Sequence, residues 1–155
     1  MKRLRVYIDT SVVGGVLDTE FFAISARFFD MVRSGQVTLL VSDLLIEELE
    51  GAPESVRNVM SELPQTAIEP LRRDPESRAL RDAYLEADVV GSSSLDDAFH
   101  VAIATVAQAD LIVSWNFKHF VNIEKIRGFN AVNIRHGYGL VDIRSPQEVA
   151  PHDEG

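Results

Sequence analysis

Two short runs of uninterrupted apolar residues constrain the fold of this chain most strongly. Val37 to Val41 reads VTLLV, and Leu111 to Ser114 reads LIVS. Strands buried on both faces have this composition, and they are typical of parallel sheets. Further strands are expected at Leu4 to Ile8, LRVYI, and less clearly at Thr66 to Leu71.

Segments with helical spacing or helix-boundary residues separate these strands. Helices are expected over residues 21–33, 43–50, 53–63, 75–87, 95–108 and 122–127. Residues 10–15 are expected to form a turn, and residues 131–134 a further strand. Alternating strands and helices indicate crossover connections. We therefore predict an α/β fold, a single-domain parallel-sheet α/β/α sandwich with helices on both faces, over residues 1–150, followed by a disordered tail over residues 151–155.

The composition limits the possible chemistry. The chain has 155 residues, 46% of them hydrophobic, which suits one globular domain. It has no cysteine, which excludes disulfides and thiolate zinc sites and is compatible with a cytoplasmic location. No apolar run approaches the roughly 20 residues that span a bilayer, so no membrane association is expected.

The net charge of −9 argues against a protein that simply coats nucleic acid. It does not exclude an enzyme acting on nucleic acid, because carboxylates that hold Mg²⁺ or Mn²⁺ reverse the local field. The four histidines show no i,i+4 pair. Any metal site must therefore be rich in oxygen ligands, which favour Mg²⁺ or Mn²⁺ over zinc.

Acidic residues stand where such a site is expected. Asp9 ends the first strand, and sites in open α/β sheets form at the carboxyl ends of strands. Taken alone, Asp9 could equally cap the following loop. On a helical wheel of residues 43–50, Glu48 borders the apolar face, whereas Glu47 and Glu50 point away from it. If this segment is simply an amphipathic helix with its glutamates in solvent, the positions of Glu47 and Glu50 are explained well and that of Glu48 less well.

A second acidic group opens the helix in SLDDAFHVAIAT. Asp96 lies nearer the bulky apolar stripe of that helix, and Asp97 shares its other side with small residues. The pattern Ser94 to Asp97 also fits a capping box, in which Asp97 would bond back to the Ser94 amide. Periodicity does not choose between the two aspartates.

The last candidate follows the strand LIVS. Asn116 could coordinate a hard metal through its carbonyl oxygen or orient a bound water. It could equally form an Asx turn that closes the strand.

As a set, YIDTS, SDLLIEELEG, SLDDAFHVAIA and LIVSWNFKHF, with the later AVNIRHGY, resemble the PIN-domain nucleases, the group that includes VapC-like toxins. The resemblance runs from Arg5 to about Val149. It assigns the family's acidic positions to Asp9, Glu48 and Asp97, and leaves Asp96 variable. The fourth position, often Asp in the family, is Asn116 here.

The resemblance implies a PIN-like fold and a metal-dependent endoribonuclease. Asp9, Asp97 and Glu48 would hold Mg²⁺ or Mn²⁺, and Asn116 would orient water or metal. The supporting residues would be Thr10, Ser11, Asp110 and Ser114. The implied partners are an RNA substrate, an antitoxin protein that neutralises the toxin, and a second copy in a homodimer.

Three alternatives to this interpretation differ in what they require of the sequence. A haloacid-dehalogenase-like phosphatase needs a second Asp where Ser11 stands. A response-regulator receiver would carry its acidic pair after the first strand. The serious alternative is a catalytically weak PIN-like module that binds RNA or protein without cutting, which Asn116 and the acidic net charge keep open.

Overall fold

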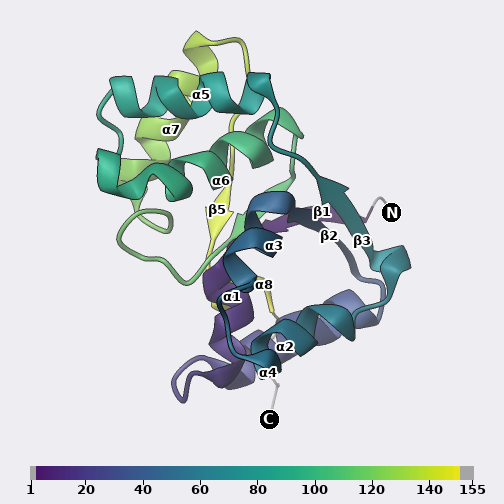
Figure 1. Cartoon of the computed structure of the whole chain (residues 1–155). Helices are drawn as coiled ribbons and strands as arrows, with labels where there is room; N and C mark the ends of the chain where they lie inside the picture. The colour runs from purple at the N-terminus through teal and green to yellow at the C-terminus, as the bar shows by residue number, and fades with distance from the viewer. Residues whose placement is uncertain (1–2, 151–155) are drawn as a thin grey trace.

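The computed structural model describes residues 3–150, so the tail predicted over residues 151–155 lies outside the described part. Within the described residues, five parallel strands form one sheet in the order β3-β2-β1-β4-β5. They are β1 (Leu4–Ile8), β2 (Val37–Ser42), β3 (Ile68–Leu71), β4 (Leu111–Val113) and β5 (Ile143–Arg144). The predicted parallel α/β sandwich is confirmed (Figure 1).

Helices cover both faces of the sheet (Figure 1). They are α1 (Thr10–Gly14), α2 (Phe22–Arg33), α3 (Asp43–Leu49), α4 (Glu54–Ser61), α5 (Pro75–Glu86), α6 (Leu95–Val106), α7 (Ile123–Arg135) and α8 (Pro146–Val149). Short 3-10 turns lie at Gly15–Leu17, Gln65–Ala67 and Ser92–Ser94. Within residues 3–150, no helix is both long and apolar enough to cross a membrane.

Alternate strand residues enter two separate cores, as the pleat of a strand requires. On one face, Val6 and Leu39 pack with α1, α2 and α4. On the other, Tyr7 and Leu40 pack with α5, α6 and α7. Strands buried on both faces explain why their sequences read as unbroken apolar runs.

Successive strands are added first on one side of β1 and then on the other. The chain adds β2 and then β3 on one side, and returns through α5 and α6 to place β4 on the other. In open α/β sheets, such a switch leaves a crevice outside the carboxyl ends of the two central strands. The residues after β1 and β4, Asp9 and Ser114, are thus brought together.

Near the C-terminus one predicted strand is wrong and one predicted helix is too short. The strand expected over residues 131–134 is part of α7, which continues the short helix expected over residues 122–127 as far as Arg135. Phe129, Val132 and Asn133 are buried at helical spacing, so packing outweighs the β-propensity of the segment. The strand is instead β5, which has only two residues and little sequence signal.

The expected turn over residues 10–15 is the one-turn helix α1 followed by a 3-10 turn. Gly15 is required there. A Cβ on Gly15 would lie 2.4 Å from Ser25 Oγ and 2.9 Å from Trp115 Nε1. Those two atoms are hydrogen-bonded to each other at 2.9 Å. The contact fastens the segment after β4 to α2.

We predict that Gly15→Ala lowers the free energy of unfolding by about 1–3 kcal/mol, because the added methyl group overpacks this contact. Gly14→Ala is the matched control, since a Cβ there meets nothing within 4 Å. Gly14→Ala should be neutral or stabilise by up to about 1 kcal/mol. Urea unfolding of both variants provides the measurement. Equal stabilities would show that the Gly15 contact does not constrain the fold.

Candidate functional site

Asp9 is the buried centre of the candidate site. It lies directly after β1 and is 5% exposed. Ser11 Oγ donates to its Oδ1 at 2.6 Å, and Ser114 Oγ donates to its Oδ2 at 2.8 Å. Asp9 is the residue before α1, but its side chain makes no capping bond. The carboxylate is therefore held by hydroxyls from α1 and from the end of β4, and capping does not explain it.

Glu48 reaches the site from α3. That helix begins at the end of β2, where Ser42 Oγ accepts the amide of Leu45 at 3.0 Å. Glu48 is half-buried, whereas Glu47 and Glu50 are exposed, as the helical wheel predicts. Thr10 Oγ1 donates to Glu48 Oε1 at 2.8 Å. This bond ties α3 to α1 immediately beside Asp9.

A buried histidine holds the same oxygen of Glu48, and the sequence analysis did not single it out. His100 Nε2 lies 2.5 Å from Glu48 Oε1, and His100 Nδ1 lies 2.5 Å from the hydroxyl of Tyr7. Tyr7 in turn donates to Ser42 Oγ at 2.9 Å. The available signal was spacing, because His100 comes three residues after Asp97 and so shares a helix face with it.

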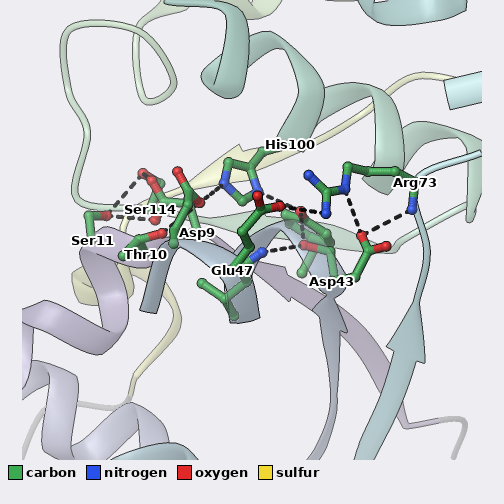
Figure 2. A network of polar contacts seen from close by, with 12 residues as sticks. Asp9, Thr10, Ser11, Asp43, Glu47, Arg73, His100 and Ser114 are labelled. Carbon is green, nitrogen blue, oxygen red and sulfur yellow. Dashed lines mark hydrogen bonds and ion pairs between the residues drawn. The ribbon is translucent and has the colours of Figure 1, made fainter. Parts of the chain in front are cut away.

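Figure 2 shows how this network is laid out. Asp9, Ser11 and Ser114 are grouped at one end, His100 lies in the middle, and Arg73 lies with Asp43 at the other end.

Arg73 forms ion pairs with Asp43 and Glu47, two acidic residues of α3. Its Nη2 is 2.6 Å from Glu47 Oε2, and its Nε is 3.1 Å from Asp43 Oδ1. The charge of Arg73 also helps to lower the pKa of Glu48. The acids on the exposed side of α3 are thus paired away from Asp9.

Asp97 joins the site from the first turn of α6 and is half-buried, while Asp96 is exposed. The capping-box interpretation is wrong, because Ser94 makes no side-chain capping bond to this helix. Asp97 is therefore not engaged as a helix cap. Only one of the two neighbouring aspartates is partly withdrawn from solvent.

The surroundings of Asp9 and Asp97 disfavour the ionised form of each carboxyl group. Burial raises the pKa of Asp9, and the negative charge of Asp97 adds to the increase, against the hydroxyl bonds and the charge of His100. Burial also raises the pKa of Asp97, with a further contribution from the charge of Glu48. The two carboxylates thus carry a negative charge that their surroundings do not fully compensate.

Glu48 behaves in the opposite way. Burial would raise its pKa, but the hydrogen bond and charge of His100, the bond from Thr10 and the charge of Arg73 together lower it below the usual value. Its Oε2 makes no hydrogen bond within residues 3–150. Glu48 is therefore held as a carboxylate with one oxygen engaged and one oxygen available.

The donor set fits a hard cation. Within the described residues, no three or more His, Asp or Glu side chains are already gathered closely enough to form a metal site. Asp9 and Asp97 nevertheless present carboxylate oxygens whose raised pKa values reflect burial and the repulsion of neighbouring carboxylates, that of Asp97 on Asp9 and that of Glu48 on Asp97. A cation bound by both would relieve that repulsion. These two residues could hold a metal, with Glu48 as a third ligand.

Asn116 lies next to the site, but its side-chain oxygen is occupied. Asn116 Oδ1 accepts the amides of Lys118 at 3.2 Å and His119 at 2.9 Å, which confirms the Asx-turn interpretation. The amide of Asn116 donates to Ser114 Oγ at 2.9 Å. His119 Nδ1 is buried without a hydrogen-bond partner in the described part of the chain.

Asp110 is not part of the site. It precedes β4, at the amino ends of the strands, and its Oδ2 accepts the amide of Arg5 at 2.8 Å. Arg5 also donates to Glu69 and to the carbonyls of Ala107 and Gln108 at the end of α6. The expected support from Asp110 is wrong, because a residue before a strand lies at the opposite edge of the sheet from one after it.

Comparisons with known proteins agree with this architecture. A family model described as PIN domain matches residues 5–118. No curated protein matches. Among the solved structures that match is a chain from the crystal structure of VapBC2 from Rickettsia felis bound to a DNA fragment from their promoter. It is 12% identical, with a TM-score of 0.54 over 90% of this chain and 98% of that chain. That likeness concerns the fold alone. Because the family model spans most of the sequence, the chain belongs to the PIN-domain family.

Proposed function

We propose that this chain is a metal-dependent endoribonuclease that hydrolyses RNA phosphodiester bonds. PIN domains are generally nucleases. The observation that carries the proposal is the pair Asp9 and Asp97, two partly desolvated carboxylates with raised pKa values at the switch point of the sheet. Carboxylates in such surroundings are costly unless a cation joins them.

In this proposal Asp9, Asp97 and Glu48 hold Mg²⁺ or Mn²⁺. Such an ion polarises a phosphoryl oxygen and lowers the pKa of a water bound to it. With the ion held there, the three acids would no longer repel a substrate phosphate, although the net charge of the chain is −9.

The remaining side chains position these ligands. Ser11 and Ser114 orient the two oxygens of Asp9. Thr10 and His100 fix one oxygen of Glu48 and leave its other oxygen available, so that it could bind the metal or accept a proton from the attacking water. Asn116 acts by shaping the segment after β4, because its side-chain oxygen already accepts two backbone amides.

We further propose that the protein is the toxin of a toxin–antitoxin pair, a homodimer in the cytoplasm that an antitoxin protein neutralises. The support is the PIN-domain match and the similarity of fold to a chain of a VapBC2 structure. The gene adjacent to this one is the simplest place to look for the antitoxin.

One observation favours a second candidate, a PIN-like module that binds RNA or protein without cutting. Asn116 stands where the resemblance expects an acid. Incubation of a structured RNA with Mg²⁺ or Mn²⁺, with and without chelator, separates the two candidates. Binding without cleavage would favour the second.

Neighbouring aspartates provide a matched pair of variants. We predict that Asp97→Asn reduces metal-dependent RNA cleavage to background, because it removes a metal-binding carboxylate without changing the size of the side chain. Asp96→Asn should mostly retain activity, since Asp96 is exposed. Cleavage rates at saturating Mn²⁺ provide the measurement. Equal losses in the two variants, or cleavage that persists in Asp9→Asn or in chelator, would contradict the proposal.

A pair of tyrosines tests the positioning of Glu48. The hydroxyl of Tyr7 holds His100, and His100 holds Glu48. Tyr7→Phe should therefore lower kcat by about 10- to 100-fold, the usual effect of losing a residue that helps to orient a metal ligand. Tyr84→Phe is the control, because that buried hydroxyl bonds Asn133 and Thr105 away from the acids. Each variant should lose about 1 kcal/mol of stability. If Tyr84→Phe lowers kcat as much as Tyr7→Phe, the network of Tyr7 and His100 has only a structural role.

A further inference from the structure

An exposed aromatic ring stands beside the candidate site. Phe117 is 49% exposed, although it lies in the segment that immediately follows β4. The preceding residue, Asn116, donates its amide to Ser114 Oγ, which itself donates to Asp9. Consecutive Cα atoms are about 3.8 Å apart. Phe117 is therefore anchored at the border of the proposed metal-binding acids.

The segment that carries this ring is fixed by hydrogen bonds. The side-chain oxygen of Asn116 accepts the amides of Lys118 and His119. Its backbone oxygen accepts the amides of Phe120 and Val121 at 3.1 and 2.9 Å. A backbone tied at both ends gives Phe117 a defined position outside the core. Because these hydrogen bonds hold the segment, the exposed ring of Phe117 keeps a fixed place beside the site, where a bound substrate could contact it.

Phe117 also continues a row of aromatic rings. Phe21 stacks on Trp115 with ring centroids 4.1 Å apart and an interplanar angle of 16°. The rings of Trp115 and Phe117 are 6.2 Å apart and tilted by 60°. Trp115 is itself buried and bonded to Ser25. The row supports Phe117 from behind and leaves part of its ring accessible.

A basic residue, Lys118, directly follows Phe117 in the sequence. Lys118 is exposed, and no hydrogen bond or ion pair engages its ammonium group within residues 3–150. His119 follows it, and its charge lowers the pKa of Asp97 against the effect of burial. An aromatic surface next to a cation is the combination by which proteins bind unpaired nucleotides, through stacking on the base and attraction of the phosphate.

We propose that Phe117 is a stacking platform for an unpaired base next to the phosphodiester that is cleaved, with Lys118 contacting the adjoining phosphate. The inference rests on the proposed nuclease function and narrows its substrate to single-stranded or looped RNA. A base within a duplex keeps both faces stacked on its neighbours and offers none to the ring.

A binding measurement tests the platform without relying on cleavage. Trp115 is the sole tryptophan of the chain, so its fluorescence reports on the ring beside it. In the presence of Mg²⁺, adenosine 5′-monophosphate should quench this fluorescence, and ribose 5-phosphate, which has no base, should not. The quenching should be lost in Phe117→Ala. Equal quenching by the two ligands, or quenching that survives in Phe117→Ala, would overturn the proposal.

Cleavage kinetics give the second test. Phe117→Ala and Phe117→Leu should each lower kcat/KM on unpaired RNA by about tenfold, within the range found for loss of one stacked base. Phe117→Trp should retain activity, because it keeps an aromatic face. The control is Ile134→Ala, a residue 63% exposed at the far end of α7, which should match the wild type.

The outcomes separate this inference from the nuclease proposal. If the wild type cleaves RNA and Phe117→Ala cleaves it equally well, the platform is wrong while the nuclease stands. Phe117 would then be free for contact with a protein partner. If the wild type does not cleave but the base-dependent quenching requires Phe117, then Phe117 does bind a base, while the nuclease proposal fails and the platform has no cleaved bond beside it. Absence of both cleavage and quenching overturns both.

Discussion

The rest of the site depends on the burial of the Asp9 carboxylate. A carboxylate that is 5% exposed loses most of its hydration, and among residues 3–150 two neutral hydroxyl groups are its only hydrogen-bond donors. Those donors come from Ser11 in α1 and Ser114 after β4, so the same bonds join the two central strands at their carboxyl ends. The residual cost appears as the raised pKa of Asp9. A bound cation is the natural compensation for such a residue.

The surroundings of the second acid, Glu48, favour its ionised form, in contrast to those of Asp9. His100, Thr10 and Arg73 stabilise its charge, and its pKa is lowered. The site therefore contains two kinds of carboxylate, with Asp9 and Asp97 under-compensated and Glu48 well compensated. Such a division suits two roles, since the first kind attracts a cation and the second holds a fixed orientation. The buried chain from Ser42 through Tyr7 to His100 provides that orientation.

Much of the fold could be predicted from the sequence, because strands buried on both faces leave unbroken apolar runs such as VTLLV and LIVS. The family was also predictable, since the motifs keep their order along the chain, and the match over residues 5–118 confirms it. The errors have physical causes. Val132 and Ile134 favour strands, but Phe129, Val132 and Asn133 are buried at helical spacing in α7. The strand β5 is too short to leave a pattern.

The geometry of the site was harder to predict than its composition. Asp9 directly follows β1, whereas Glu48 and Asp97 lie in α3 and α6, and the roles of the three acids stay a prediction. Local spacing could not reveal that the Asn116 oxygen is consumed by two amides, or that His100 pairs with Glu48 across 52 residues of sequence. Asp110 was misplaced because a few residues of separation along a strand decide which edge of the sheet a side chain reaches.

The most direct test of this account is an anomalous X-ray difference map from crystals of the protein soaked in Mn²⁺. If Asp9 and Asp97 together bind a cation, a peak lies in contact with both carboxylates, and no such peak is found in Asp97→Asn crystals soaked in the same way. A wild-type map without a peak at these two residues, with Mn²⁺ at a concentration that supports cleavage, would contradict it.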